Sequence, residues 1–329
     1  MNTERQYVPY GGQAVVEGVM MRGPRFFAVA CRKPDGTIDV HLEDVEAGWL
    51  GRLSWLKRPF LRGGFALIDA MTLGIRALKY SADLQIEQEG QSERTQRLND
   101  VAVGGTLVLG LALGIGLFVI LPTLITGLLP WRHATGLNVL DGLVRITFFV
   151  AYIAVVGRME AIARVFAYHG AEHKCINAME LGQPLTVESA MSQSRIHPRC
   201  GTSFVVVVLL LSILVFSLFG RPPAYIRVPM HLVLLPVVAG IAYEVIRLAG
   251  RMRNTRWLRF ALAPGMATQA LSTREPDAEQ VEVALAALTA VVAAEERGCL
   301  PEPTDHLERS ASAEAQGEPV EVLQEPTGG

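Results

Sequence analysis

The stretch VAVGGTLVLGLALGIGLFVILPTLITGLL, from Val101 to Leu129, decides the fold. It contains no charged side chain over about 29 residues, and about 20 apolar residues are enough for a helix to cross the hydrocarbon core of a bilayer. Pro122 lies inside the run and is expected to kink the helix. The sequence therefore predicts a transmembrane helix over 101–129.

The composition agrees with a membrane protein. The chain has 329 residues, of which 50% are hydrophobic and 19% charged, and its mean hydropathy is +0.30. The net charge of −2 shows no general basicity, so we expect no nucleic-acid partner. The four cysteines form no C-x-x-C pair, which is typical of a reducing compartment rather than of a disulfide framework. Residues 1–10 lack the apolar stretch of a signal peptide.

Three further apolar segments are candidate spans, over residues 137–156, 204–219 and 228–248. An even number of spans places both termini on the same side of the membrane. Arginine and lysine are concentrated before the first span, between the second and third spans, and after the fourth. Because such residues favour the cytoplasmic side, we expect a multi-pass protein of the cytoplasmic (inner) membrane with both termini in the cytoplasm and the lipid bilayer as its partner.

The N-terminal part is predicted to be a small β-rich unit over residues 7–45. Gln13–Met21 reads as one strand, and Phe26–Arg32 with Thr37–Leu42 reads as a hairpin closed by a Pro-Asp-Gly turn. Glu17 stands among apolar residues of the first strand. It either faces solvent or serves as an acid inside a pocket.

Three other segments complete the predicted architecture. Residues 55–82 form an amphipathic helix that lies on the membrane surface or packs on other helices. The cytoplasmic C-terminal segment, 264–298, combines a turn-rich stretch over 264–276 with an amphipathic helix over 277–297. Residues 300–329 have the composition of a disordered tail. The predicted fold class is an α-helical integral membrane protein with about four transmembrane helices, a small N-terminal β-rich unit and a cytoplasmic C-terminal helix.

The motif YHGAEHK, Tyr168–Lys174, carries the chemistry. His169, Glu172 and His173 share one face of a helix because positions i, i+3 and i+4 coincide. Their order, H-x-x-E-H, matches the inverzincin arrangement of two imidazole metal ligands and a glutamate general base. The alternative is a polar helix face without a metal. Gly170 inside the motif weakens the helix by about 1 kcal/mol.

The predicted cytoplasmic loop over 157–203 supplies further ligands. His197 and Cys200 stand just before the third span, and about 23 residues separate His173 from His197, a loop that is easily closed. Nitrogen and sulfur ligands suit a divalent metal, above all Zn²⁺. His197 could instead cap a turn, and Cys200 could fill apolar space. The candidate metal ligands are therefore His169, His173, His197 and Cys200, with Glu172 as the catalytic base.

Two more acidic residues are polar candidates. Glu180 lies in the same loop, and Glu244 lies inside the fourth predicted span, where carboxylates are costly and are usually paired or functional. Glu244 could instead form a salt bridge with Arg247. Asp141 and Arg145, at positions i and i+4 of the second span, can satisfy each other. A straight continuation of that span would carry His169 about 20 Å from the bilayer, so contact with Cys200 requires a bend or a shorter span.

Five blocks of the sequence occur together in a known family. They are GGQAVVEGVMMRGP (11–24), YHGAEHK (168–174), RIHPRCGTSF (195–204), YEVIR (243–247) and STREPDAEQVEVALAAL (272–288). On these blocks the chain resembles, over about residues 7–297, the YqhQ-like family of bacterial multi-spanning membrane proteins of unknown function, catalogued as predicted metal-dependent enzymes. The resemblance implies an integral membrane protein and metal-dependent chemistry, and it implies no substrate.

Two functions follow from these residues. The first is a cytoplasm-facing, metal-dependent enzyme, with hydrolysis as the expected reaction and Glu172 as the base. The second is a non-enzymatic membrane scaffold, assembly factor or transporter component, in which the central loop holds a structural metal or a polar cluster. Four spans are few for a transporter unless the chain forms a homo-oligomer, and the sequence shows none of the internal repeats typical of transporter folds.

Overall fold

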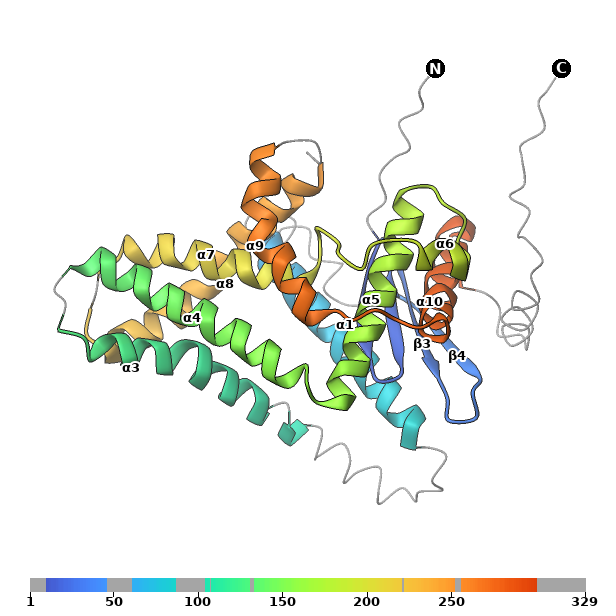
Figure 1. The fold of residues 1–329 in the computed structure, drawn as a ribbon, viewed down its shortest axis with the longest axis horizontal. Helices are drawn as coiled ribbons and strands as arrows, with labels where there is room; N and C mark the ends of the chain where they lie inside the picture. Colours follow the sequence, from blue (N-terminus) through green and yellow to red (C-terminus); the bar gives the residue numbers. More distant parts are fainter. Residues whose placement is uncertain are drawn as a thin grey trace.

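The computed structural model describes residues 10–45, 61–86, 104–106, 108–130, 133–220, 222–251 and 256–300. Helices predominate, and they fall into a bundle of apolar helices and a second unit built on a β-sheet (Figure 1). The mostly helical chain with a small N-terminal sheet confirms the coarse fold class.

The sheet has four antiparallel strands in the order β1-β2-β3-β4. The strands are β1 (Gly11–Val15), β2 (Gly18–Arg22), β3 (Phe26–Arg32) and β4 (Ile38–Asp44). The hairpin of β3 and β4 is confirmed. The single strand predicted over 13–21 is wrong, because the chain reverses at Val16 and Glu17, and Glu17 adopts a positive φ of 51°. The two central turn positions hold neither glycine nor asparagine, so they carry no turn signal in the sequence.

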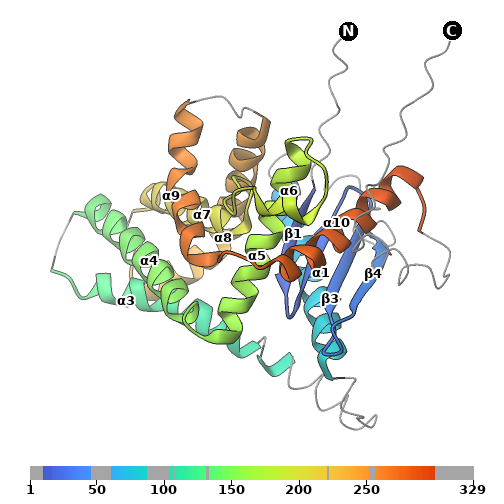
Figure 2. The same cartoon turned by 45° about the vertical axis from the view of Figure 1, so that its right-hand side comes forward.

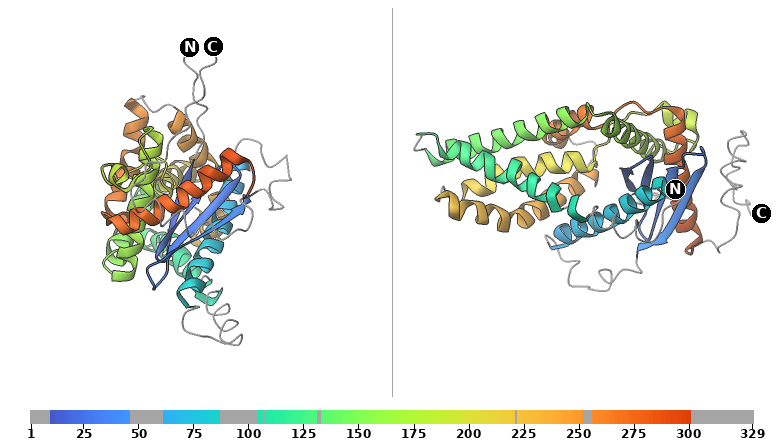
Figure 3. Two further views of the ribbon diagram at one scale, coloured as in Figure 1. Left: turned by 90° about the vertical axis from the view of Figure 1, so that its right-hand side faces the viewer. Right: turned by 90° about the horizontal axis from the view of Figure 1, so that it is seen from below.

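Helices cover both faces of this sheet. On one face Val19 and Met21 pack against α5 (Glu160–Glu180) and α10 (Ala278–Arg297). On the other face Met20 and Phe27 pack against α1 (Leu61–Ile86). Figure 3 shows α10 lying across the strands. The result is a three-layer unit whose central strands, β2 and β3, are buried on both sides.

Helix α1 agrees with the helix predicted over 55–82, although residues 55–60 lie outside the described part of the chain. Leu73 and Ala77 are buried against the sheet. Ile68 and Met71 lie on the other side and are at least half exposed. Contacts with both the sheet and α8 (Ala224–Arg251) place α1 between the two parts of the molecule.

The bundle contains three helices long and apolar enough to cross a membrane, Gly104–Gly127, Thr135–Val156 and Ala224–Leu248. The second and third belong to α4 (Ala134–Val156) and α8. The third predicted span corresponds to α7 (Gly201–Ser217), which has only 17 residues. At 1.5 Å per residue such a helix reaches about 26 Å, short of the roughly 30 Å of a hydrocarbon core. The described residues thus hold three full-length candidates and one shorter apolar helix.

The first candidate span is irregular around Pro122. Gly116–Ile120 forms a π-helical segment, η5, and α3 (Leu121–Gly127) follows with Pro122 in its first turn. Proline lacks the N–H that would continue the ladder of hydrogen bonds, and a π-segment is one way in which a helix absorbs such an interruption.

A polar network joins the helices of the bundle. Arg145 Nε donates to Asp141 Oδ2 at 2.8 Å, which confirms the pair expected at i and i+4. Arg145 also donates to Thr123 Oγ1 at 3.1 Å and to His231 Nδ1 at 3.0 Å. Thr126 donates to Asp141 Oδ1 at 3.0 Å. One buried guanidinium therefore links α3, α4 and α8.

A sharp bend separates α4 from α5. Gly157 caps α4, and Met159 is extended, with ψ 132°, before α5 begins at Glu160. Figures 1 and 2 show α5 running across the direction of α4. The predicted connection over 157–203 contains α5, which carries both histidines, followed by the short α6 (Val187–Met191).

The C-terminal segment differs in part from the prediction. Helix α9 (Arg256–Ser272) runs through Pro264, so the turn-rich stretch predicted over 264–276 is wrong as far as Ser272. Helix α10 is confirmed, with a capping box between Asp277 and Gln280 and a left-handed Gly298 at its end. The disorder predicted for 300–329 falls outside the described residues beyond Leu300.

Candidate metal centre

Helix α5 positions both histidines of the motif. Tyr168, Ala171 and Cys175 face the sheet and α10 and anchor the helix in the core. His169 and His173 are one helical turn apart, and their ring centroids lie 4.4 Å from each other. His173 is buried, whereas His169 is partly exposed.

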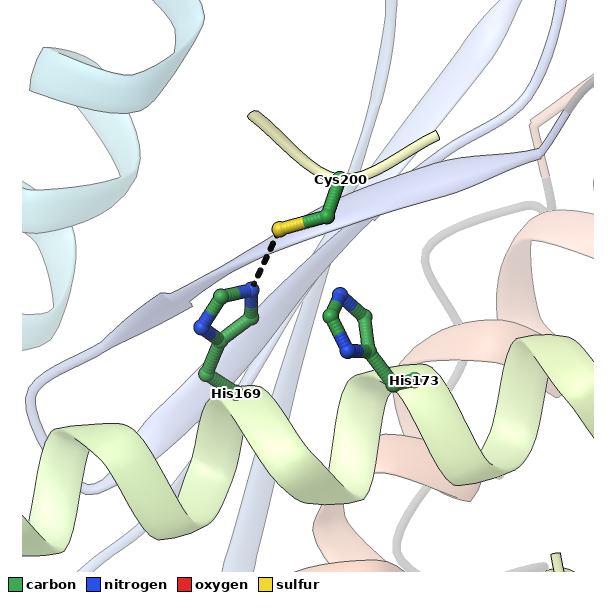
Figure 4. A group of neighbouring side chains, drawn as sticks. All are labelled: His169, His173 and Cys200. Carbon is green, nitrogen blue, oxygen red and sulfur yellow. Dashed lines mark hydrogen bonds between the residues drawn. The ribbon is translucent and has the colours of Figure 1, made fainter. Parts of the chain in front are cut away.

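Cys200 completes a group of three metal-ligating side chains. One ligand atom from each of His169, His173 and Cys200 lies within 4.8 Å of the other two. His169 Nε2 and Cys200 Sγ are 3.2 Å apart, and Figure 4 shows both imidazoles turned toward the sulfur. Cys200 is the N-cap of α7, where its Sγ accepts from the Thr202 amide. The bend before α5 brings these two helices together.

Backbone carbonyls hold the two imidazoles in place. His169 Nδ1 is 2.8 Å from the Ser272 carbonyl, and His173 Nδ1 is 2.7 Å from the Arg195 carbonyl. A carbonyl only accepts, so each Nδ1 carries a proton, and in the neutral form of each imidazole Nε2 keeps its lone pair. This is the arrangement that orients histidines toward metals in proteins.

The three side chains fit a small divalent cation. A tetrahedral zinc ion with bonds of about 2.0 Å to nitrogen and 2.3 Å to sulfur holds its ligand atoms about 3.3–3.5 Å apart. The spacing in the structure, up to 4.8 Å, closes to that value with side-chain movements of about 1 Å. Two nitrogens and one sulfur leave a fourth position, which catalytic zinc sites use for water or substrate.

Glu172 lies beside this group. It is 5% exposed, and its Oε2 is 3.5 Å from His173 Nε2, the nitrogen that would bind a metal. This contact is an ion pair only when His173 is doubly protonated, so with Nε2 unprotonated no salt bridge among the described residues compensates the carboxylate. A buried carboxylate is costly unless a cation compensates it. A divalent ion between the histidines and Cys200 would supply that compensation.

His197 is adjacent to the group but outside it. Its ring centroid is 5.7 Å from that of His173, and its Nε2 is 3.5 Å from Glu180 Oε2. Its backbone amide and carbonyl are both bound by the side chain of Gln269, at 2.9 and 2.7 Å. In this geometry His197 supports the loop that carries Cys200.

The other acidic candidates lie outside the group of three. Glu180 binds Arg199 and faces His197, and Glu244 lies on the span-length helix α8. Glu17 binds the guanidinium of Arg164, with Nη2 to Oε2 at 2.6 Å. This ion pair raises the pKa of Arg164. Through this pair Glu17 ties the β1–β2 turn to α5.

Cys175 is not a candidate metal ligand, although it lies on the same helix as the two histidines. Its side chain points into the core between the sheet and α10. Burial raises the pKa of its thiol, so the thiolate that a metal would require is disfavoured. Among the cysteines of the described chain, Cys200 alone joins the cluster of metal-ligating side chains.

Gly170 has a packing role that explains its place inside the motif. A Cβ at this position would lie 2.1 Å from the carbonyl oxygen of Arg274. The chain leaving α9 therefore passes directly over α5, and this same chain presents the Ser272 carbonyl to His169. The glycine lowers helix propensity but permits the close contact that orients a candidate ligand.

We expect Gly170→Ala to destabilise the protein by about 1–3 kcal/mol, because the 274–276 segment must move to admit the methyl group. Gly110→Ala is the matched control, since a Cβ there meets open space. Thermal unfolding of the two purified variants in detergent measures the difference. Equal melting temperatures for both variants would show that the close approach is not a constraint.

Backbone atoms and an amide side chain supply the parts of the site that sequence reasoning missed. The carbonyls of Ser272 and Arg195 orient the histidines, and Gln269 holds the loop before Cys200. Ser272 and Arg195 each begin a sequence block on which the family resemblance rests. Their place at the start of these blocks is the sequence feature that could have identified Ser272 and Arg195.

The comparisons with known proteins give a family. The family described as "Protein of unknown function (DUF1385)" matches residues 58–294. The chain is also 36% identical over 290 residues to the "Uncharacterized protein YqhQ" of Bacillus subtilis (strain 168), covering 84% of this chain and 90% of that protein. No solved structure matches. With most of its length matched in both comparisons, the chain belongs to the DUF1385 family of YqhQ-like proteins.

Proposed function

We propose that this protein is a membrane-bound, metal-dependent enzyme, with hydrolysis as its reaction and zinc as its metal. The observation that supports it best is the convergence of His169, His173 and Cys200 within 4.8 Å. The carbonyl-fixed tautomers of the two histidines add to it, because they leave both Nε2 atoms as metal-binding donors. When bound, the ion would act as a Lewis acid toward a substrate or water oxygen.

Glu172 is the proposed general base. Its carboxylate lies 3.5 Å from a candidate ligand atom, so a water molecule bound at the site would have a buried proton acceptor beside it. It would accept the proton of that water as the water attacks the substrate, and general-base catalysis of this kind contributes about 10²–10⁴ in rate. Glu172→Gln tests this function, because it removes the proton acceptor and leaves all three candidate ligands intact.

The membrane placement rests on the surface of the bundle. Large apolar side chains on the candidate spans are more than half exposed; these include Val108, Leu109, Leu113, Leu143, Val155 and Val233. A soluble protein rarely exposes so extended an apolar surface. We place the bundle in the cytoplasmic membrane and the sheet unit, with the candidate metal centre, in the cytoplasm.

Reporter fusions test this orientation. With the shorter helix α7 taken as the third of four crossings, the arginine and lysine distribution predicts that fusions after Arg132 and after Pro222 report the outside, whereas a fusion after Cys299 reports the cytoplasm. Alkaline phosphatase and fluorescent-protein fusions, which are active on opposite sides, give complementary readouts. An outside signal at Cys299 would move the candidate metal centre to the other side of the membrane.

A further inference from the structure

A cleft lies where α4 leaves the bundle. It has a volume of about 200 Å³ and is lined by residues from the end of α4, the bend that follows it and the end of α9. Ile153, Ala154 and Leu271 supply apolar walls, and Arg158 and Arg274 supply two guanidinium groups. Among the described residues that line the cleft, none is acidic.

The side chain of each arginine donates one hydrogen bond to a backbone carbonyl of the protein. Arg158 Nη1 donates to the Ala154 carbonyl at 3.1 Å, and Arg274 Nη2 donates to the Gly157 carbonyl at 2.5 Å. These contacts cap the C-terminal carbonyls of α4. A guanidinium has five N–H donors, and within the described chain neither arginine has a hydrogen bond or ion pair to a carboxylate. Further donors of both groups are therefore available to an anion at the cleft.

The surroundings of the cleft favour a lipid over a soluble anion. Tyr152 and Val155, on the last turns of α4, are 44% and 62% exposed, and Leu271 at the cleft itself is 40% exposed. A tyrosine and apolar side chains followed by arginines are typical of a helix end at the membrane interface. The cleft is smaller than the 300–1,000 Å³ of pockets that enclose whole small ligands. It therefore suits a headgroup, with the acyl chains left outside along α4.

We propose that this cleft binds the phosphate of an anionic phospholipid through Arg158 and Arg274, with the lipid tails against the apolar face of α4. The proposal rests on the membrane placement and not on the metal centre. Arginine is well suited to the phosphate because its planar fork can donate two parallel hydrogen bonds. A bound lipid would fix the junction of α4, α5 and α9, the segment that also carries Ser272 to His169.

Native mass spectrometry of the full chain in detergent tests the proposal, with phosphatidylglycerol and phosphatidylcholine added in parallel. We expect phosphatidylglycerol to bind preferentially. Arg158→Gln with Arg274→Gln should weaken that binding by about 30-fold, equivalent to about 2 kcal/mol for two basic residues at an anionic surface. The control pair Arg25→Gln with Arg297→Gln removes the same charge from the sheet unit and should bind as the unmodified chain does. Arg158→Lys with Arg274→Lys should give intermediate binding, because lysine keeps the positive charge and loses the planar fork of arginine.

Three results would overturn the proposal. They are equal binding of the two lipids by the unmodified chain, an unchanged preference in the glutamine pair, and full competition by soluble glycerol 3-phosphate, which would assign the cleft to a soluble phosphate compound. Because lipid preference is measured on the unmodified chain, a misfolded variant does not remove the test. Resistance of the chain to carbonate extraction tests membrane placement separately.

Discussion

Glu172→Gln is expected to yield a folded, metal-loaded protein whose activity falls by about 10²–10⁴. Glutamine has nearly the same shape as glutamate, so the packing of α5 against Gly12, where a Cβ would lie 2.8 Å from Glu172 Cγ, is preserved. The substitution leaves His169, His173 and Cys200 unchanged and removes only the proton acceptor. Complementation of a chromosomal deletion at matched expression provides the readout, and metal content and melting temperature establish that the fold is intact.

Glu188→Gln is the matched control, because Glu188 is an exposed glutamate on α6 in the same segment. It should complement fully. Full complementation by Glu172→Gln would instead exclude a general base at this position. The metal would then be structural, and the scaffold, assembly or transporter role would become the better account of the protein.

Arg145→Met should be the most damaging single substitution in the bundle, with an expected loss of about 3–5 kcal/mol. It leaves the carboxylate of Asp141 buried without its guanidinium and removes donors to Thr123 and His231. Removing one partner of a buried pair is costly because the remaining charge stays desolvated. Melting temperatures in detergent, followed by fluorescence-detected size exclusion, measure the loss.

Two variants show whether the charge is the cause. Arg145→Met combined with Asp141→Leu should recover most of the stability, since replacing both members of a buried pair by apolar residues is often neutral. Arg76→Met breaks the exposed pair of Arg76 with Glu43 and should cost at most about 1 kcal/mol. If Arg145→Met is as mild as Arg76→Met, the network does not hold α3, α4 and α8 together.

The apolar helices could be predicted because a long run of apolar residues is visible in the sequence itself. Uncharged runs long enough to cross a bilayer identify α4 and α8 without any knowledge of packing. The sequence places a short but strongly apolar span over 204–219, and the helix there, α7, runs from Gly201 to Ser217. Helix α7 differs from the three full-length candidate spans in its length and not in its hydropathy.

The sheet was harder to interpret for two physical reasons. The β1–β2 turn is formed by Val16 and Glu17, neither of which favours a turn, and the positive φ of Glu17 is accompanied by a distant ion pair with Arg164. The strand FFAVACR is buried on both faces. An unbroken apolar run of this kind is typical of a strand covered on both sides, so coverage by α1 and α10 could have been expected from it.

Of the candidate metal centre, only the pairing of the two histidines could be predicted from the sequence. Helical periodicity alone places His169 and His173 on one face. Their approach to Cys200 depends on the bend at Gly157–Met159, and the sequence does not encode its direction in any local pattern. The groups that orient the imidazoles are the backbone carbonyls of Ser272 and Arg195. Backbone atoms are common to all residues and leave no mark in a sequence.

Metal analysis of the purified, detergent-solubilised chain by mass spectrometry tests the central claim most directly. The account predicts about one zinc or other divalent ion per chain, as expected for a single three-ligand site. It predicts loss of that metal in His169→Ala and in His173→Ala, and retention in His41→Ala, a half-exposed histidine of the sheet. Cys200→Ser should weaken metal binding, and retained metal in that variant would make His197 the third ligand. Stoichiometric metal that persists in the His169→Ala, His173→Ala double variant would contradict the assignment of the site.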